Sequence, residues 1–386
     1  MRVNLDAMSG SASTARAHTA WADAVARGWS DPQRAHAEGR AARALLDDAR
    51  EHVAAVLGAR ADEIAFTHSL SQAHRRAVAG LAIGTVRNGA HVVSSAVEHS
   101  ALLHACAALA DGWRTPNTQA WDYTIVEVQP DGAVNADAFV SAVNRAPTAF
   151  AVLQAANGEV GTRQPLADVA QRLAGSIPLL VDGTALLGEP NFDETPWDVL
   201  TAAASHLGAP NACAVLAVRT GTRWRSPDRP TDTYEHGWVP GQPDVANIAA
   251  FAAALTESAA ETERCHRLNA LSRQIRDAVP NLISDCVVVG ASDSRVSHIV
   301  TMSFLYVSGA ALAAELDDAG FAVASGSACA SDVLAPSHVL SAMGALTEGN
   351  IRVSLPWHIT QEDVDAFLTA LPRCVARVRE KFGAPS

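Results

Sequence analysis

The amino-acid sequence predicts an α/β protein with a large domain and a smaller α+β domain. In the first half of the 386-residue chain, short apolar runs alternate with helical segments, which favours a parallel sheet. After about residue 245 this alternation stops, and a long helical segment introduces a different pattern. We therefore expect the large domain at residues 15–250 and the small domain at residues 1–14 and 251–386.

The predicted strands of the large domain are mostly continuous apolar runs. They lie at residues 63–67, 91–95, 124–128, 149–154, 178–183 and 212–219. Such runs are typical of strands whose two faces are both covered, as in a parallel sheet flanked by helices. Residues 35–57 have apolar positions at helical spacing with charges between them, which predicts an amphipathic helix. The large domain is therefore expected to hold a mostly parallel sheet flanked by helices.

The small domain is predicted to begin with a long helix at about residues 246–280. Strands are expected at residues 287–290, 298–305 and 351–355, and helices at residues 309–320 and from about residue 361. Because these elements do not alternate regularly, they indicate an α+β domain with its own sheet.

Composition excludes several classes of protein. The formal net charge is −12 without a basic cluster, which does not support nucleic-acid binding. No apolar run reaches the length of about 18 residues that a membrane span needs, and the first residues lack a secretory apolar stretch. The six cysteines are widely spread, so neither a disulfide framework nor a metal site is indicated. We expect a cytoplasmic protein with no bound metal.

A loop around Cys329 is the strongest chemical signal in the sequence. Residues 324–344 read ASGSACASDVLAPSHVLSAMG, with small residues on both sides of Cys329. A cysteine in such a loop can reach out and react, which suits a nucleophile or a sulfur carrier. An ordinary buried cysteine beside a turn is an equal alternative from the spacing alone.

This segment resembles the active-site loop of cysteine desulfurases, in the long-loop branch of the class V aminotransferases. Further resemblance lies in LDAMSG (5–10), EIAFTHSLSQA (63–73), EHSALL (98–103), AANGEVGTRQPL (155–166), VDG (181–183) and NIRVSL (350–355). The resemblance implies fold type I of the pyridoxal-phosphate enzymes, with a seven-stranded type of sheet in the large domain and a homodimer. In that family the loop cysteine takes sulfur from a cysteine–pyridoxal adduct, becomes a persulfide and leaves alanine.

The resemblance also implies roles for four residues of the cofactor pocket. His99 matches the imidazole that stacks on the pyridine ring, and Asp182 matches the carboxylate that pairs with the ring nitrogen. Arg352 matches the arginine that clamps the substrate carboxylate, and Asn157 lies near the ring oxygen. Without the family, Asp182 would also suit a helix cap and Arg352 a surface position.

Other positions depart from the family pattern. Ser205 and His206 keep the family's polar residues of the cofactor pocket, but Leu207 stands where the resemblance expects the Schiff-base lysine. The chain has a single lysine, Lys381, near its end. In the phosphate-binding turn, Ser71 alone keeps a hydroxyl at its family position.

These departures lead to an expectation about the cofactor. The bulky side chains of Trp29, Trp238 and Trp357 lie in segments that line the family's pocket, and indoles are large enough to fill a vacated space. We therefore expect no covalently bound cofactor, and pyridoxal phosphate is expected to bind weakly or not at all.

Three functions remain open on this reading. The first is a sulfur-relay or regulatory pseudoenzyme with Cys329 as persulfide carrier. The second is a structural subunit of a sulfur-transfer complex. The third is an active pyridoxal-phosphate enzyme with an atypical site. The expected partner is a second copy, an active desulfurase in a heterodimer, or a sulfur-acceptor protein, with no nucleic acid and no membrane.

Overall fold

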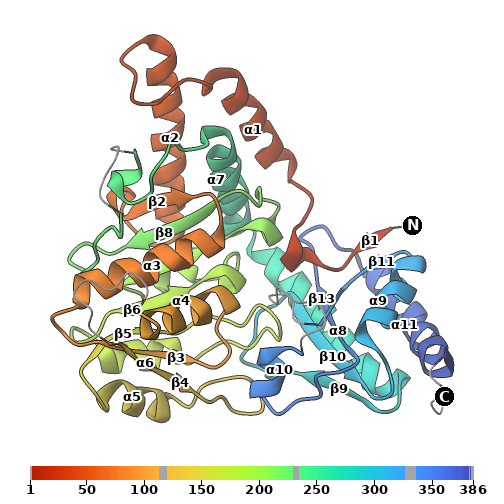
Figure 1. The fold of residues 1–386 in the computed structure, drawn as a ribbon. Coiled ribbons are helices and arrows are strands. Elements are labelled where there is room, and N and C mark those ends of the chain that lie inside the picture. Colours follow the sequence, from red (N-terminus) through yellow and green to blue (C-terminus); the bar gives the residue numbers. More distant parts are fainter. Residues whose placement is uncertain (1, 113–119, 229–233, 327–335, 382, 384–386) are drawn as a thin grey trace.

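The computed structural model describes residues 2–112, 120–228, 234–326, 336–381 and 383 (Figure 1). Cys329 lies outside the described residues, so its predicted role is not addressed by the structure. The described part of the chain forms two main sheets, a seven-stranded sheet in the large domain and a four-stranded sheet in the small domain. In this part of the chain, no helix is both long and apolar enough to cross a membrane.

The large sheet has the strand order β2-β8-β7-β6-β5-β3-β4. Its strands are β2 (Ile64–Thr67), β3 (His91–Ser95), β4 (Asp122–Val126), β5 (Thr148–Val152), β6 (Leu179–Asp182), β7 (Val199–Ala202) and β8 (Ala214–Val218). Strand β8 is antiparallel to both of its neighbours, and every other pair in this sheet is parallel. The prediction of a mostly parallel, seven-stranded α/β sheet is confirmed.

Both faces of this sheet are covered by helices, as the continuous apolar runs predicted. Helices α2 (Ala37–Val56), α5 (Ala136–Asn144), α6 (Leu166–Leu173) and α7 (Val245–Ala260) pack with one face, and α3 (Leu70–Thr85) and α4 (Ser100–Ala110) with the other. Neighbouring residues of one strand belong to opposite faces, because side chains alternate along a strand. Val93 lies in the first core and Val92 in the second. Helix α1 (Ala15–Arg27) packs against α7, away from the sheet (Figure 1).

The small domain has a sheet of order β12-β13-β10-β9. Its strands are β9 (Cys286–Val289), β10 (Ile299–Phe304), β12 (Ala324–Ser325) and β13 (Asn350–Ser354), and its helices are α8 (Thr262–Leu282), α9 (Gly309–Asp318), α10 (His338–Ala342) and α11 (Gln361–Lys381). The chain's start joins this domain, since β1 (Val3–Asn4) pairs in parallel with β11 (Phe321–Ala322). Leu5 is fully buried in the same core.

The structure differs from the prediction in several elements. Strands β1, β7, β11 and β12 were not expected, and the helix predicted at about residues 246–280 is two helices that meet at Glu261. Glu261 has the non-helical angles φ −105° and ψ 68°, although no glycine or proline marks the break. The division of the chain into domains at residue 250 stays a prediction.

Candidate functional site

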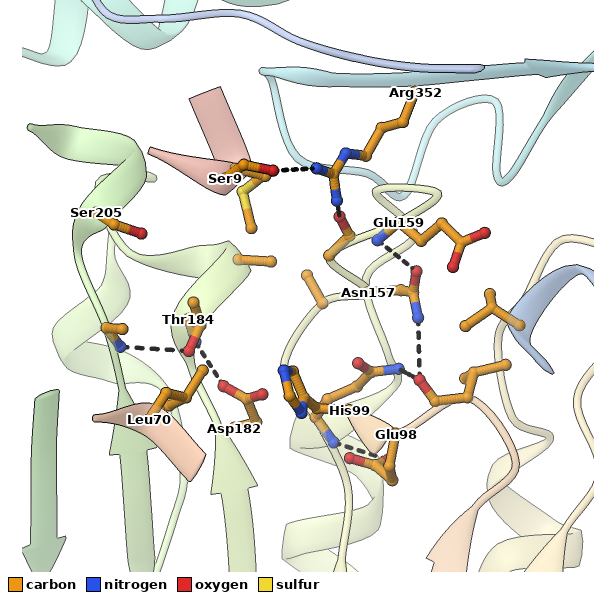
Figure 2. Close-up of a pocket in the computed structure, with 18 of the residues that line it drawn as sticks. Ser9, Leu70, Glu98, His99, Asn157, Glu159, Asp182, Thr184, Ser205 and Arg352 are labelled. Carbon is orange, nitrogen blue, oxygen red and sulfur yellow. Dashed lines mark hydrogen bonds between the residues drawn. The ribbon is translucent and has the colours of Figure 1, made fainter. Parts of the chain in front are cut away.

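A cavity of about 310 Å³ lies at the carboxyl edge of the large sheet (Figure 2). It is lined by residues that follow β3, β5, β6 and β7, by Met8 and Ser9 of the N-terminal segment, and by Arg352 from β13. Parallel strands end at one edge, so loops far apart in sequence meet there, and ligands of open α/β sheets bind at this edge. The volume lies in the range of small-molecule sites.

His99 and Asp182 both line this cavity, as the resemblance implied. His99 is the N-cap of α4, and its Nδ1 accepts a hydrogen bond from the Ala101 N–H at 3.1 Å. Burial lowers the pKa of His99. Asp182 ends β6, and its Oδ1 accepts from the Thr184 N–H at 2.9 Å. The strand end and the helix start therefore fix an imidazole and a carboxylate in one pocket.

Glu98, beside His99, is a fully buried acid in the same pocket. Its Oε1 accepts hydrogen bonds from the Ser95 hydroxyl at 2.5 Å and the Gln154 N–H at 3.1 Å. Its Oε2 has no hydrogen-bond partner within the described part of the chain. Burial raises the pKa of Glu98 to about 8, against the effect of these two hydrogen bonds. Glu98 is therefore mostly protonated at neutral pH.

Asn157 lines the cavity but its amide braces the backbone. Its Nδ2 donates to the Val97 carbonyl at 3.0 Å, and its Oδ1 accepts from the N–H groups of Glu159 and Val160, both at 2.8 Å. These hydrogen bonds occupy the amide oxygen of Asn157 and fix the backbone of the loop, so Asn157 shapes the part of the cavity wall that carries Glu159 (Figure 2). Burial raises the pKa of the Glu159 carboxyl to about 7, against the Ser337 hydroxyl and the charge of Arg352.

Arg352 is already paired with an internal carboxylate. Its Nη2 donates to Asp6 Oδ1 at 2.7 Å and to the Ser9 hydroxyl at 3.3 Å, and its Nη1 donates to the Gly158 carbonyl at 3.2 Å. The guanidinium has the planar fork that recognises carboxylates. A ligand carboxylate at Arg352 would have to share it with Asp6.

The turn at Ser205–Leu207 presents only Ser205 to the cavity. The His206 ring turns away, with its Nε2 3.1 Å from the Leu187 carbonyl and its face stacked on His298 at 5.2 Å. Burial lowers the pKa of His206 to about 3. Leu207 is buried and packs against Gly188. Neither His206 nor Leu207 lines the cavity.

Several other sequence-predicted residues lie away from the cavity. Ser71 is exposed in the first turn of α3, and Leu70 lines the cavity instead. Trp29 is 68% exposed, and Trp238 packs on another tryptophan. Trp357 lines a separate, much smaller cavity beside His206. The expectation that indoles fill the pocket is wrong, because none of the three points into it.

No lysine lines the cavity within the described residues. Lys381, the chain's single lysine, is at the end of α11, where its side chain is 64% exposed and pairs with Glu315.

Sequence reasoning missed four residues that shape the site. Glu98 and Glu159 stand inside the segments EHSALL and AANGEVGTRQPL, so their position next to His99 and Asn157 was an available signal. Asp6 likewise stands inside the segment LDAMSG, whereas His74 gave no signal, because it approaches its partner in the site through the fold alone. His74 Nε2 lies 3.5 Å from Asp182 Oδ2.

Comparison with known proteins identifies the family. Residues 4–367 match the model of the family described as Aminotransferase class-V. Over 357 residues the chain is 30% identical to cysteine desulfurase IscS 1 of Archaeoglobus fulgidus, and the match covers 91% of each protein. The chain belongs to the cysteine desulfurase family. The cysteine desulfurase IscS of Dictyoglomus turgidum is also 30% identical, over 91% of this chain and 89% of its own length.

Solved structures of this family share the fold. A NifS-like protein superimposes with a TM-score of 0.88 at 24% identity, over 98% of this chain and all of its own. The apo structure of the cysteine desulfurase from Thermococcus onnurineus NA1 gives a TM-score of 0.84 at 18% identity, over 97% of this chain and 95% of its own. The predicted fold type I architecture is thereby confirmed.

The expectation that no cofactor is bound covalently and that pyridoxal phosphate binds weakly or not at all is wrong. The homologous cysteine desulfurases depend on pyridoxal phosphate, and nothing in the comparisons indicates that this chain has lost it. The expectation rested on the missing lysine at position 207 and on indoles filling the pocket, and no indole lines the cavity. The residues present fit the group, since His99 and Asp182 face an open cavity and the first turn of α3 can receive an anion.

Proposed function

We propose that this cysteine desulfurase-family protein is a sulfur-transfer protein that receives sulfur on Cys329 from a partner. The supporting observation is that the cavity keeps His99, Asp182 and Arg352 while its described lining contains no lysine. The lysine-dependent release of sulfur from cysteine needs an amine beside the cofactor. Lys381 is engaged with Glu315 at the end of α11 and does not line the cavity.

The pocket residues would still support cofactor and ligand binding. Pyridoxal phosphate, when bound, supplies an electron sink. The Asp182 carboxylate would hold the proton on its ring nitrogen, and the His99 imidazole would cover the ring. Arg352 would bind a ligand carboxylate, and the neutral acid Glu98 would add no charge to the pocket near pH 7.

The test is sulfur loading of Cys329. The purified chain is incubated with an active cysteine desulfurase and sulfur-labelled cysteine, and the label is located by mass spectrometry after thiol alkylation. We expect the label on Cys329, its loss in Cys329→Ser, and its retention in the control Cys286→Ser, which changes a partly exposed cysteine of β9. Absence of label from Cys329 in the wild-type chain would refute the proposal.

A second candidate is a structural subunit that pairs with an active desulfurase. The observation that favours it is an apolar surface made by Trp21, Val25 and Trp29, which are 41%, 46% and 68% exposed. Trp21 and Val25 are four residues apart on α1, so they share one side of it, and Trp29 lies just beyond the end of α1. If this is the function, Trp21→Ser with Trp29→Ser abolishes co-purification with the partner while Cys329→Ser leaves it intact. Loss of co-purification in Cys329→Ser but not in the double tryptophan variant would contradict this function.

A further inference from the structure

A buried histidine lies behind the pocket, next to Asp182. His74 of α3 has no exposed surface. Its Nδ1 is 3.0 Å from the Thr201 hydroxyl, and its Nε2 is 3.5 Å from Asp182 Oδ2. Within the described residues, that Nε2 makes no hydrogen bond. Burial lowers the pKa of His74 to about 3 against the pull of Asp182, so the ring is neutral at physiological pH.

A neutral imidazole carries one proton, and the surroundings of His74 select its position. With the proton on Nδ1, the Nε2 lone pair would face the Asp182 carboxylate and repel it. With the proton on Nε2, that N–H lies beside the carboxylate, with Nε2 3.5 Å from Oδ2. Nδ1 can then accept from the Thr201 hydroxyl at 3.0 Å, a shorter contact than the 3.4 Å from that hydroxyl to the Val181 carbonyl. The second arrangement satisfies both contacts, and His99, whose ring centre is 5.1 Å away, adds no competing positive charge while neutral.

The sheet fixes the partners of His74. Asp182 of β6 and Thr201 of β7 are opposite each other in the register, so their side chains stand on the same face of the sheet. The other oxygen of Asp182, Oδ1, accepts from the Thr184 N–H at 2.9 Å (Figure 2). An N–H at Oδ2 would therefore hold the carboxylate from both sides.

We propose that His74 is a positioning residue that orients Asp182 through its Nε2–H, with the Thr201 hydroxyl selecting this tautomer. This deepens the part of the proposed function in which Asp182 holds the ring nitrogen of pyridoxal phosphate. Behind the pocket, three residues are then linked by contacts that run from Thr201 through His74 to Asp182.

The first test uses the ligand-free protein and does not depend on cofactor binding. Long-range ¹H–¹⁵N correlation spectra of histidine-labelled protein report the tautomer, and the signal of His74 is assigned by its loss in His74→Gln. We expect a neutral ring protonated at Nε2, and a change of this signal in Thr201→Val. Protonation at Nδ1, or a doubly protonated ring at pH 7, would overturn the proposal.

The second test separates positioning from folding. A glutamine amide reaches about where Nε2 lies, whereas the shorter asparagine amide reaches only about as far as Nδ1. His74→Asn should weaken the binding of pyridoxal phosphate about tenfold, measured by quenching of protein fluorescence, and His74→Gln should restore it to within about threefold of wild type. The control His91→Gln changes another buried histidine, one bonded to Thr148 and Thr124 on the far strands, and should leave affinity unchanged.

The results distinguish the two proposals. Equal loss in His74→Asn and His74→Gln means a packing role and overturns the positioning role. If the wild-type chain takes no pyridoxal phosphate at all, the cofactor part of the proposed function fails, and the tautomer of His74 still decides the proposal made for it.

Discussion

Replacing Glu98 by glutamine should change how the stability of the protein depends on pH. In an unfolded chain the glutamate ionises near its ordinary pKa of 4.5, whereas buried Glu98 keeps its proton up to about pH 8. Between these values the folded state binds one more proton than the unfolded state. The wild-type free energy of unfolding therefore falls as the pH rises from about 4.5 to about 8.

The size of the effect follows from the width of this pH window. Each pH unit costs about 1.4 kcal/mol, so ionising Glu98 in its buried position costs about 5 kcal/mol by pH 9. Glu98→Gln keeps an oxygen for the Ser95 hydroxyl and the Gln154 N–H and cannot ionise. Relative to wild type, the variant should gain about 5 kcal/mol of stability between pH 4 and pH 9.

Urea unfolding followed by circular dichroism at pH 4, 6.5 and 9 measures this difference. All other titrating groups are shared by the two proteins, so their contributions cancel in the comparison. The control Glu51→Gln removes an exposed carboxylate of α2 and should follow the wild type at every pH. A difference between Glu98→Gln and wild type that stays constant with pH would refute the assignment of Glu98 as a buried neutral acid.

Three further predictions concern the pocket and the core. Ser205→Lys, but not Leu207→Lys, should let borohydride fix pyridoxal phosphate onto the protein, because Ser205 lines the cavity and Leu207 does not; mass spectrometry showing the reverse contradicts this geometry. Asp6→Asn removes the carboxylate that pairs with Arg352, so it should tighten the binding of 3-mercaptopropionate about fivefold, measured by calorimetry. Weaker binding would contradict competition between Asp6 and the ligand for Arg352. Glu235→Gln breaks the buried ion pair with Arg50 and should lower the free energy of unfolding by about 3 kcal/mol, measured in urea. A loss below about 1 kcal/mol would contradict this prediction.

Much of the fold could be predicted from sequence because its strands are buried on both faces. Apolar runs such as residues 91–95 and 178–183 stand out between helical segments and became β3 and β6. Strand β7, Val199–Ala202, runs directly into the alanine-rich residues 202–204, and alanine is uncommon in strands, so the sequence did not mark it. The break at Glu261 has no glycine or proline, so the local sequence gave no sign of it.

The site was predicted in part. His99, Asp182 and Arg352 follow recognisable motifs, and the structure brings all three to one cavity. The direction of Leu207 could not be predicted, because successive side chains of a 3₁₀ turn point about 120° apart and the motif does not fix that rotation. The approach of His74 to Asp182 joins positions 108 residues apart, which only the packing of α3 on the sheet creates.

Exposed apolar residues on and beside α1 are the surface that we expect to contact a partner protein. Trp21 lies on α1, which packs against α7, and Trp29 lies just beyond the end of α1; both side chains are exposed in the single chain. A sulfur-transfer protein has to meet a donor, and a large apolar patch is the usual mark of such a contact. Sulfur loading of Cys329 and contact with a partner through the α1 surface can therefore be tested separately, the first with Cys329→Ser and the second with Trp21→Ser and Trp29→Ser.

The most direct test of the central claim is alanine release from L-cysteine by the purified chain with added pyridoxal phosphate. Cofactor binding is followed by fluorescence in the same samples, and Cys329→Ser is the reference. The account predicts that pyridoxal phosphate binds and that alanine forms no faster than in Cys329→Ser. Alanine formed at a catalytic rate, and lost in Cys329→Ser, would show that the chain desulfurates cysteine by itself and would contradict the account.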